Sequence, residues 1–142
     1  MPNIILVSGG FDPIHSGHMK LISDACNHGE VVVLLNSDQW LRNKKGKEFL
    51  PMHERKIIMK SIKCVIDVIE FDDTDNTCVD GIKKAIEKYK NHNIKFANGG
   101  DRNTGTTPEL KFCYENNVEN LWGIGGNDKS NSSSWILKKW KG

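Results

Sequence analysis

Two histidines near the start of the chain, His15 and His18, are the residues whose type and spacing point most directly to chemistry. They lie in residues 4–22, which read IILVSGGFDPIHSGHMKLI. On a helix, positions three apart are neighbours, so both imidazoles can face one bound group. A glycine pair, Gly9 and Gly10, separates an apolar run from the histidines. A strand, a glycine turn and the start of a helix together form a site for anionic phosphate, because free backbone N–H groups and the helix dipole converge there.

The elements that must position these histidines alternate between strand and helix. Apolar runs predict strands at residues 4–7, 30–36, 65–71, 93–97 and 118–124. Helical patterns predict helices at 17–26, 51–63, 79–90, 108–115 and 132–140. Ser16 is expected as the first N-cap, and residues 37–49 as a polar loop with a short helix. This alternation predicts an α/β fold: a single domain over residues 1–142, with a doubly wound, Rossmann-like parallel sheet of five strands and helices on both faces.

Composition excludes several classes of protein. A net charge of +2 is too small to indicate nucleic acid as a partner. No apolar run approaches 18 residues, so we expect no membrane insertion. The four cysteines are widely spaced and form no C-x-x-C pair. That pattern is typical of reduced thiols in a cytosolic protein, and we expect a cytoplasmic location.

The segment GFDPIHSGH, residues 10–18, resembles the signature of the cytidylyltransferase-like nucleotidyltransferases, in which an H-x-G-H core follows G-x-F-D. The resemblance implies that a substrate phosphate attacks the α-phosphorus of a nucleoside triphosphate and that pyrophosphate leaves. It implies that His15 and His18 stabilise the charge that builds during this step. The residues that would hold the nucleotide here are Gly9, Gly10, Phe11 and Asp12. Gly10 matches a position where a side chain would block the approach of phosphate.

A second motif comprises residues 36–38, NSD, and the basic segment after it. Heptose-phosphate adenylyltransferases and glycerol-phosphate cytidylyltransferases carry a lysine in this loop that reaches the phosphates. The spacing from NSD matches Lys45 to it, with Lys44 as the alternative. Arg55 matches an arginine that these families place near the substrate, and a structural salt bridge is its competing role. Otherwise, the basic residues are interpreted as a solvated surface.

Two further motifs lie in the second half of the chain. Residues 96–102, FANGGDR, are similar to the family's G-G-D segment, so Gly99 and Asp101 are predicted to hold the nucleotide, and Arg102 a phosphate or the acceptor. The hydroxyls of Ser132, Ser133 and Ser134 match the family's S-T-T segment at a helix start. In the glycerol-phosphate group an arginine precedes that segment. Here residues 127–129, NDK, stand in its place, which weakens the glycerol-phosphate assignment.

The resemblance favours a cytidylyltransferase that uses CTP and a small phosphorylated acceptor, for cell-surface polysaccharide or capsule biosynthesis. The alternative is an adenylyltransferase that uses ATP with a sugar phosphate. Glycerol phosphate, a sugar phosphate, phosphocholine and phosphoglutamine stay open as acceptors. Mg²⁺ is expected as the counterion of the triphosphate. A homodimer is common in this family.

Three other interpretations compete with this one. Asp12, His15 and His18 could form the two-histidine, one-carboxylate set of a non-haem iron oxygenase. The protein could be a nucleotide sensor without catalysis, or the histidines could be surface residues of a glycine-rich turn.

The acidic run Asp72, Asp73 and Asp75 could hold a cation, although a solvated loop is favoured.

Overall fold

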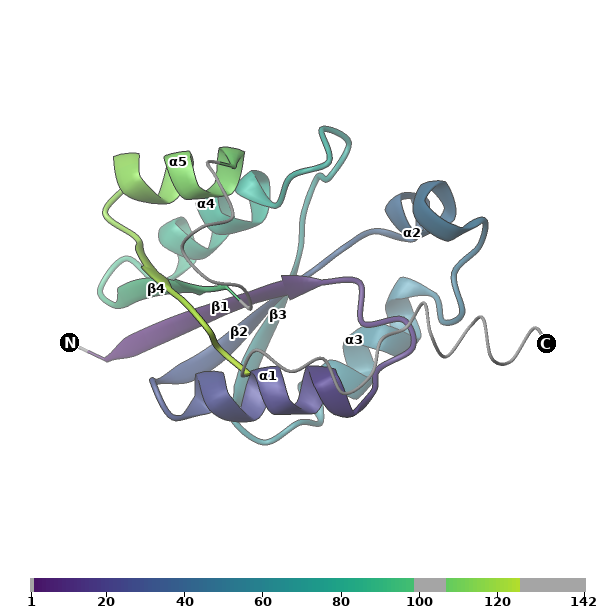
Figure 1. Ribbon diagram of the computed structural model, residues 1–142, viewed down its shortest axis with the longest axis horizontal. Coiled ribbons are helices and arrows are strands. Elements are labelled where there is room, and N and C mark those ends of the chain that lie inside the picture. Colours follow the sequence, from purple (N-terminus) through teal and green to yellow (C-terminus); the bar gives the residue numbers. More distant parts are fainter. Residues whose placement is uncertain (1, 99–106, 126–142) are drawn as a thin grey trace.

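The computed structural model describes residues 2–98 and 107–125, which alternate between strands and helices (Figure 1). The strands are β1 (Asn3–Gly9), β2 (Glu30–Leu35), β3 (Val65–Glu70), β4 (Asn93–Ala97) and β5 (Glu119–Leu121). The helices are α1 (Ser16–Cys26), α2 (Asp38–Lys45), α3 (Met52–Lys60), α4 (Val79–Lys88) and α5 (Pro108–Glu115). Among the described residues, no helix has the length and apolar character needed to cross a membrane.

All five strands form one parallel sheet in the order β3-β2-β1-β4-β5. β1 lies at the centre, where Ile4 pairs with Glu30 of β2 on one side and with Ile94 of β4 on the other. The chain therefore builds the sheet outward from β1 in one direction, through β2 and β3. It then returns to the other side of β1 with β4. The predicted α/β fold with a five-stranded parallel sheet is confirmed.

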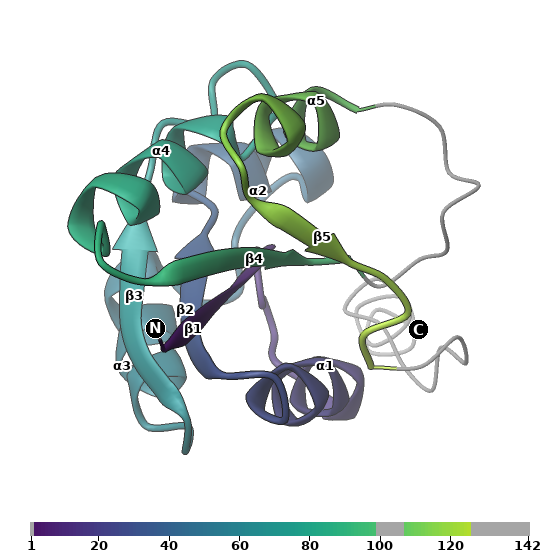
Figure 2. The same cartoon turned by 90° about the vertical axis from the view of Figure 1, so that its left-hand side faces the viewer.

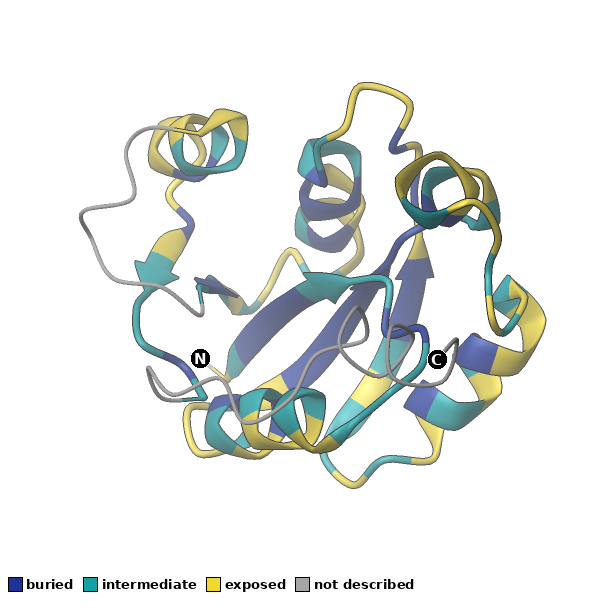
Figure 3. Cartoon of the chain, turned by 45° about the vertical axis from the view of Figure 1, so that its right-hand side comes forward, coloured by how far each residue is buried: buried dark blue, intermediate teal, exposed yellow. Residues whose placement is uncertain are grey.

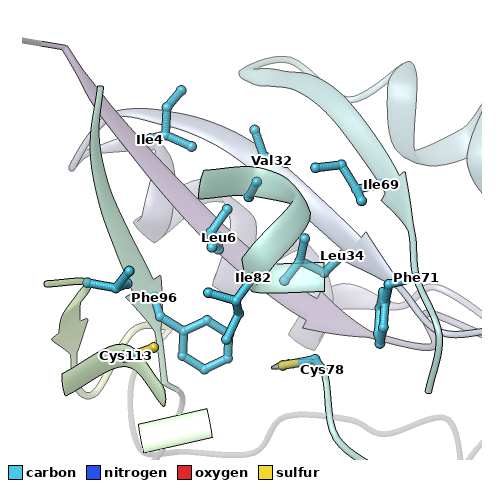
Figure 4. Close-up of a cluster of buried hydrophobic side chains, with 12 residues drawn as sticks. Ile4, Leu6, Val32, Leu34, Ile69, Phe71, Cys78, Ile82, Phe96 and Cys113 are labelled. Carbon is cyan, nitrogen blue, oxygen red and sulfur yellow. The ribbon is translucent and has the colours of Figure 1, made fainter. Parts of the chain in front are cut away.

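Both faces of the sheet are covered, because successive side chains of a strand point to opposite faces. Ile4 and Leu6 of β1 belong to one buried cluster, which α4 and α5 close with Ile82 and Cys113 (Figure 4). Ile5 and Val7 belong to the other, which α1 and α3 close with Ile22, Ala25 and Met59. Figure 2 shows these helix pairs on opposite sides of the sheet. The central strands are dark blue in Figure 3, as the continuous Val and Leu run of β2 predicts.

The polar region after β2 contains a short helix, as predicted. Residues 38–45 form an eight-residue helix, α2, whose N-cap is Ser37: its hydroxyl oxygen accepts a hydrogen bond from the N–H of Trp40 at 3.0 Å. α2 lies beyond the carboxyl ends of the strands, where the start of α1 also lies (Figure 1). The predicted helix at 132–140 lies outside the described residues.

The expectation of four reduced thiols is wrong for one pair, because Cys26 and Cys64 form a disulfide with a Cα–Cα distance of 6.0 Å. Spacing along the sequence did not reveal it. The end of α1 and the residue before β3 meet because both flank β2. Cys78 and Cys113 are buried free thiols. Burial raises the pKa of Cys78 to about 12 and that of Cys113 to about 11, which keeps both protonated at neutral pH.

Candidate functional site

The turn between β1 and α1 carries the histidine pair, and backbone capping fixes both rings. His15 is the N-cap of α1, in place of the predicted Ser16: its Nδ1 accepts a hydrogen bond from the N–H of Gly17 at 3.1 Å. Nδ1 of His18 accepts one from the N–H of His15 at 3.2 Å. The rings stack with their centroids 3.8 Å apart. Because Nδ1 accepts in each ring, a neutral ring carries its proton on Nε2.

His18 is held neutral at physiological pH. Its pKa is lowered to about 4, first by burial and second by the neighbouring His15. The ring of Phe11 supports it from the edge, at a centroid distance of 4.7 Å. Phe11 is buried and has a φ of 49°, which is unusual for a residue other than glycine. In the structure, Phe11 therefore packs against the ring of His18.

Lys45, the last residue of α2, contacts the turn between β1 and α1 at Asp12. Its Nζ lies 3.0 Å from Oδ2 of Asp12 and also contacts the Asp12 carbonyl oxygen. The Asp12 carboxylate is buried and accepts the N–H groups of Phe49 and Leu50 at 2.6 and 2.7 Å. Lys44 lies instead with its Nζ 4.9 Å from the centre of the Trp40 ring. Of the two candidate lysines, the structure brings Lys45 to the turn.

Arg55 is fully buried and satisfied by the protein itself. Its Nε donates to the carbonyl oxygen of Leu50 at 2.9 Å, and Nη1 donates to those of Gly10 and Asn36 at 3.0 and 2.8 Å. Nη2 donates to Oδ1 of Asp38 at 2.6 Å. These contacts favour the structural alternative over contact with a substrate, because the guanidinium has no exposed face.

Gly10 lies where α2 crosses the turn. A Cβ at this position would lie 2.7 Å from Cδ2 of Leu41, which is itself buried. The glycine is therefore required for the packing of α2 against the turn. Its predicted role in admitting phosphate stays a prediction. Gly9, just before it, accepts the N–H of Asn36 at its carbonyl oxygen, at 3.0 Å.

Asp73 is a residue that sequence reasoning missed. The acidic run after β3 was expected to be solvated, and Asp72 and Asp75 are indeed exposed, but Asp73 is buried against the end of β2. Its carboxylate accepts three hydrogen bonds from Asn36 and Ser37. No sequence signal separates Asp73 from its neighbours, since the three aspartates share one polar loop.

A cavity of about 340 Å³ lies beyond the ends of β1 and β4. Its lining includes Ser8, Ala97 and Asn98 from these strand ends, with Cys78, Thr107 and Glu109 from the starts of α4 and α5. This is the point where the chain's path reverses direction across the sheet. Ligands of open parallel sheets bind at such a point, in cavities of about this size.

The remaining predicted residues lie outside the part of the chain that the structure describes. These are Gly99, Asp101, Arg102, Ser132, Ser133 and Ser134. The described site therefore consists of the histidine turn, Lys45 with Asp12, and the cavity at β1 and β4.

Fold and site together define a doubly wound α/β protein with a turn after its first strand that carries two stacked histidines. A family model described as cytidylyltransferase-like matches residues 6–121. This chain belongs to the cytidylyltransferase-like family, as the residues of the turn predicted.

Curated relatives agree with this assignment, and a solved structure shares the fold. The chain is 30% identical over 145 residues to the bifunctional protein HldE of Geobacter metallireducens, which covers 95% of this chain and 27% of that protein. HldE of Geobacter sulfurreducens is 28% identical over 141 residues, with coverages of 95% and 27%. The chain thus spans little more than a quarter of the length of these relatives. The fold is similar to that of a lipopolysaccharide core biosynthesis protein from Thermoplasma volcanium, with a TM-score of 0.60, 19% identity and coverage of 86% of this chain and 95% of that one.

Proposed function

We propose that this chain is a nucleotidyltransferase that joins a nucleoside triphosphate to a small phosphorylated acceptor and releases pyrophosphate. The observation that carries the proposal is the stacked pair His15 and His18, whose Nδ1 atoms are both engaged by backbone N–H groups. Their Nε2–H groups act as fixed donors at the start of α1. In-line attack by an acceptor phosphate on the α-phosphorus needs no protein nucleophile, only alignment and stabilisation of charge.

Lys45 supplies the positive charge at this site. In the structure it is paired with Asp12, whose two backbone hydrogen bonds hold the carboxylate in place. Its ammonium lies at the turn that carries the histidines, and it acts on triphosphate oxygens there. The cavity at the ends of β1 and β4 is large enough to take part of the nucleotide.

The nucleotide is CTP in this proposal, and ATP is the alternative. CTP is favoured by the likeness of the motifs to those of short cytidylyltransferases. The similarity to the HldE proteins supports the alternative, an ADP-heptose-type adenylyltransferase, and such an enzyme uses ATP. A role in cell-surface polysaccharide or capsule biosynthesis, a homodimer and a cytoplasmic location belong to the same proposal. The disulfide is the observation against the cytoplasmic location.

Mg²⁺ neutralises the triphosphate in this proposal and is held mainly by phosphate oxygens and water. Across the part of the chain that the structure describes, no group of three His, Cys, Asp or Glu side chains is arranged to hold a metal ion. The Asp12 carboxylate accepts the N–H groups of Phe49 and Leu50, and Nδ1 of each histidine accepts a backbone N–H, which leaves each neutral ring protonated on Nε2. These three side chains therefore do not fit the ligand set of the non-haem iron alternative.

The test is a screen for pyrophosphate release with CTP, ATP, GTP and UTP against a panel of phosphorylated acceptors. His18→Ala is expected to lower kcat by about 10²–10³, the usual effect of removing one donor to a developing negative charge. His28→Ala is the matched control, because His28 is an exposed histidine of the loop after α1. Full turnover in His18→Ala would contradict the proposal. Triphosphate binding without pyrophosphate release would instead favour the nucleotide sensor.

A further inference from the structure

Asp73 is a buried carboxylate with neutral hydrogen-bond donors. It is 5% exposed, and it accepts Nδ2 of Asn36 at 3.0 Å, the N–H of Ser37 at 2.8 Å and the hydroxyl of Ser37 at 2.7 Å. Its neighbours in the loop differ. Asp75 is exposed and, among the residues that the structure describes, accepts hydrogen bonds from Thr77 of its own loop. Burying a charged carboxylate costs free energy unless hydrogen bonds compensate for the lost water. The three donors therefore fix the position of the Asp73 carboxylate relative to Asn36 and Ser37.

The partner Ser37 connects Asp73 to α2. A hydroxyl has one proton, and Ser37 gives it to Oδ1 of Asp73, so its lone pairs are left for the N–H of Trp40 in the first turn of α2. Asp73 thus fixes both the rotation of the N-cap hydroxyl and, through the Ser37 N–H, the backbone where α2 begins.

The other end of α2 carries Lys45. α2 lies beyond the ends of the strands and does not cover a face of the sheet (Figure 1). Three contacts between described residues hold it in place. Leu41 packs against Gly10, Asp38 forms an ion pair with Arg55, and Lys45 forms one with Asp12. A helix of eight residues is about 12 Å long, so a tilt at the N-cap moves Lys45 relative to the histidine turn.

We propose that Asp73 is a positioning residue for the transfer reaction, which sets the place of Lys45 through Ser37 and α2 without contacting a substrate. The inference rests on the proposed function, because it assumes that Lys45 acts on the triphosphate. It assigns a role to a residue of the β3–α4 loop, which none of the family motifs in this chain includes.

The test compares Asp73→Asn in two backgrounds. Asparagine has the same shape, but its amide group repels one of the three donors. In the wild-type background we expect kcat/KM to fall about 10–100-fold, the usual cost of displacing a group that binds a substrate. In Lys45→Met the same change is expected to cost less than threefold, because the group that it positions is absent. Asp75→Asn is the matched control and is expected to stay within twofold of its parent in both backgrounds.

Binding of CTP and ATP, measured by calorimetry, gives a second readout that needs no turnover, with the same expected dependence on Lys45. If Asp73→Asn does not fold, Ser37→Ala breaks the same link and leaves the carboxylate two of its donors. Equal losses in both backgrounds would show a merely structural role and overturn the inference, while the proposed function stands. A wild-type protein that neither binds triphosphate nor releases pyrophosphate would overturn the proposed function and the role of Asp73 with it.

Discussion

Replacing Arg55 by methionine tests whether this residue supports the fold or binds the substrate. Methionine keeps most of the apolar stem and removes the guanidinium. The carbonyl oxygens of Leu50, Gly10 and Asn36 then lose their donor, and the Asp38 carboxylate loses its charged partner. Each buried acceptor without a donor costs about 1–3 kcal/mol, but water reaches part of this site, since Asp38 is 27% exposed. We therefore expect a loss of about 3–5 kcal/mol in the free energy of unfolding, as for other broken buried ion pairs.

Urea unfolding followed by circular dichroism measures this loss. With a slope of about 1–3 kcal/mol per molar urea, the midpoint should fall by at least about 1 M. Arg42→Met is the matched control. Arg42 also makes a two-pronged ion pair, with Glu48, but on the surface, so its removal should shift the midpoint far less. An Arg55→Met protein with the wild-type midpoint and a raised KM for the acceptor would refute the reasoning and restore the substrate-binding role.

Two further predictions concern the disulfide and the histidine. Reducing the disulfide Cys26–Cys64 opens a loop of 38 residues and should lower the free energy of unfolding by about 4 kcal/mol. Urea midpoints with and without reductant measure this loss of stability. As a control, the midpoint of Cys26→Ser should not change with reductant. Four alkylated thiols in the unreduced, unfolded protein would contradict the disulfide. His18, whose pKa is lowered to about 4 by burial and by His15, binds its proton more readily when unfolded. Stability should therefore fall as pH drops from about 6.5 toward 4, and less steeply in His18→Gln; equal slopes would contradict this.

The fold could be predicted because its signals are local. The apolar runs of β1 and β2 and the helical pattern of α4 each stand within a dozen residues, and their alternation is typical of a parallel sheet. α2 could be predicted only as a short helix without bounds, because its sequence, DQWLRNKK, is polar and contributes one buried side chain, Leu41. A helix that buries so little leaves almost no periodic pattern for a sequence to show.

The site could be predicted in its residue types but only partly in its geometry. The histidine spacing predicted that both rings can face one bound group, and the structure adds that the rings stack. The N-cap is His15 and not Ser16, because an imidazole Nδ1 accepts a backbone N–H as a serine hydroxyl does. The partners of the charged residues were not visible. Lys45 and Asp12 are 33 positions apart, and Asp73 lies 36 positions from Ser37. Such pairs are set by which strand ends are neighbours in the sheet, and spacing along the chain carries no record of it.

The family motif residues of this chain fall into two groups according to their contacts. His15 and His18 each accept a backbone N–H at Nδ1, whereas Gly10, Asp12 and Arg55 make their contacts with other parts of the protein. Arg55 and Asp12 fix the two flanks of the turn, through the Gly10 carbonyl and through the backbone of residues 49–50. A donor pair stabilises a transition state only if it need not reorganise when charge develops. Under the proposed function, the buried motif residues would therefore serve the same chemistry as the histidines, by keeping the turn from moving.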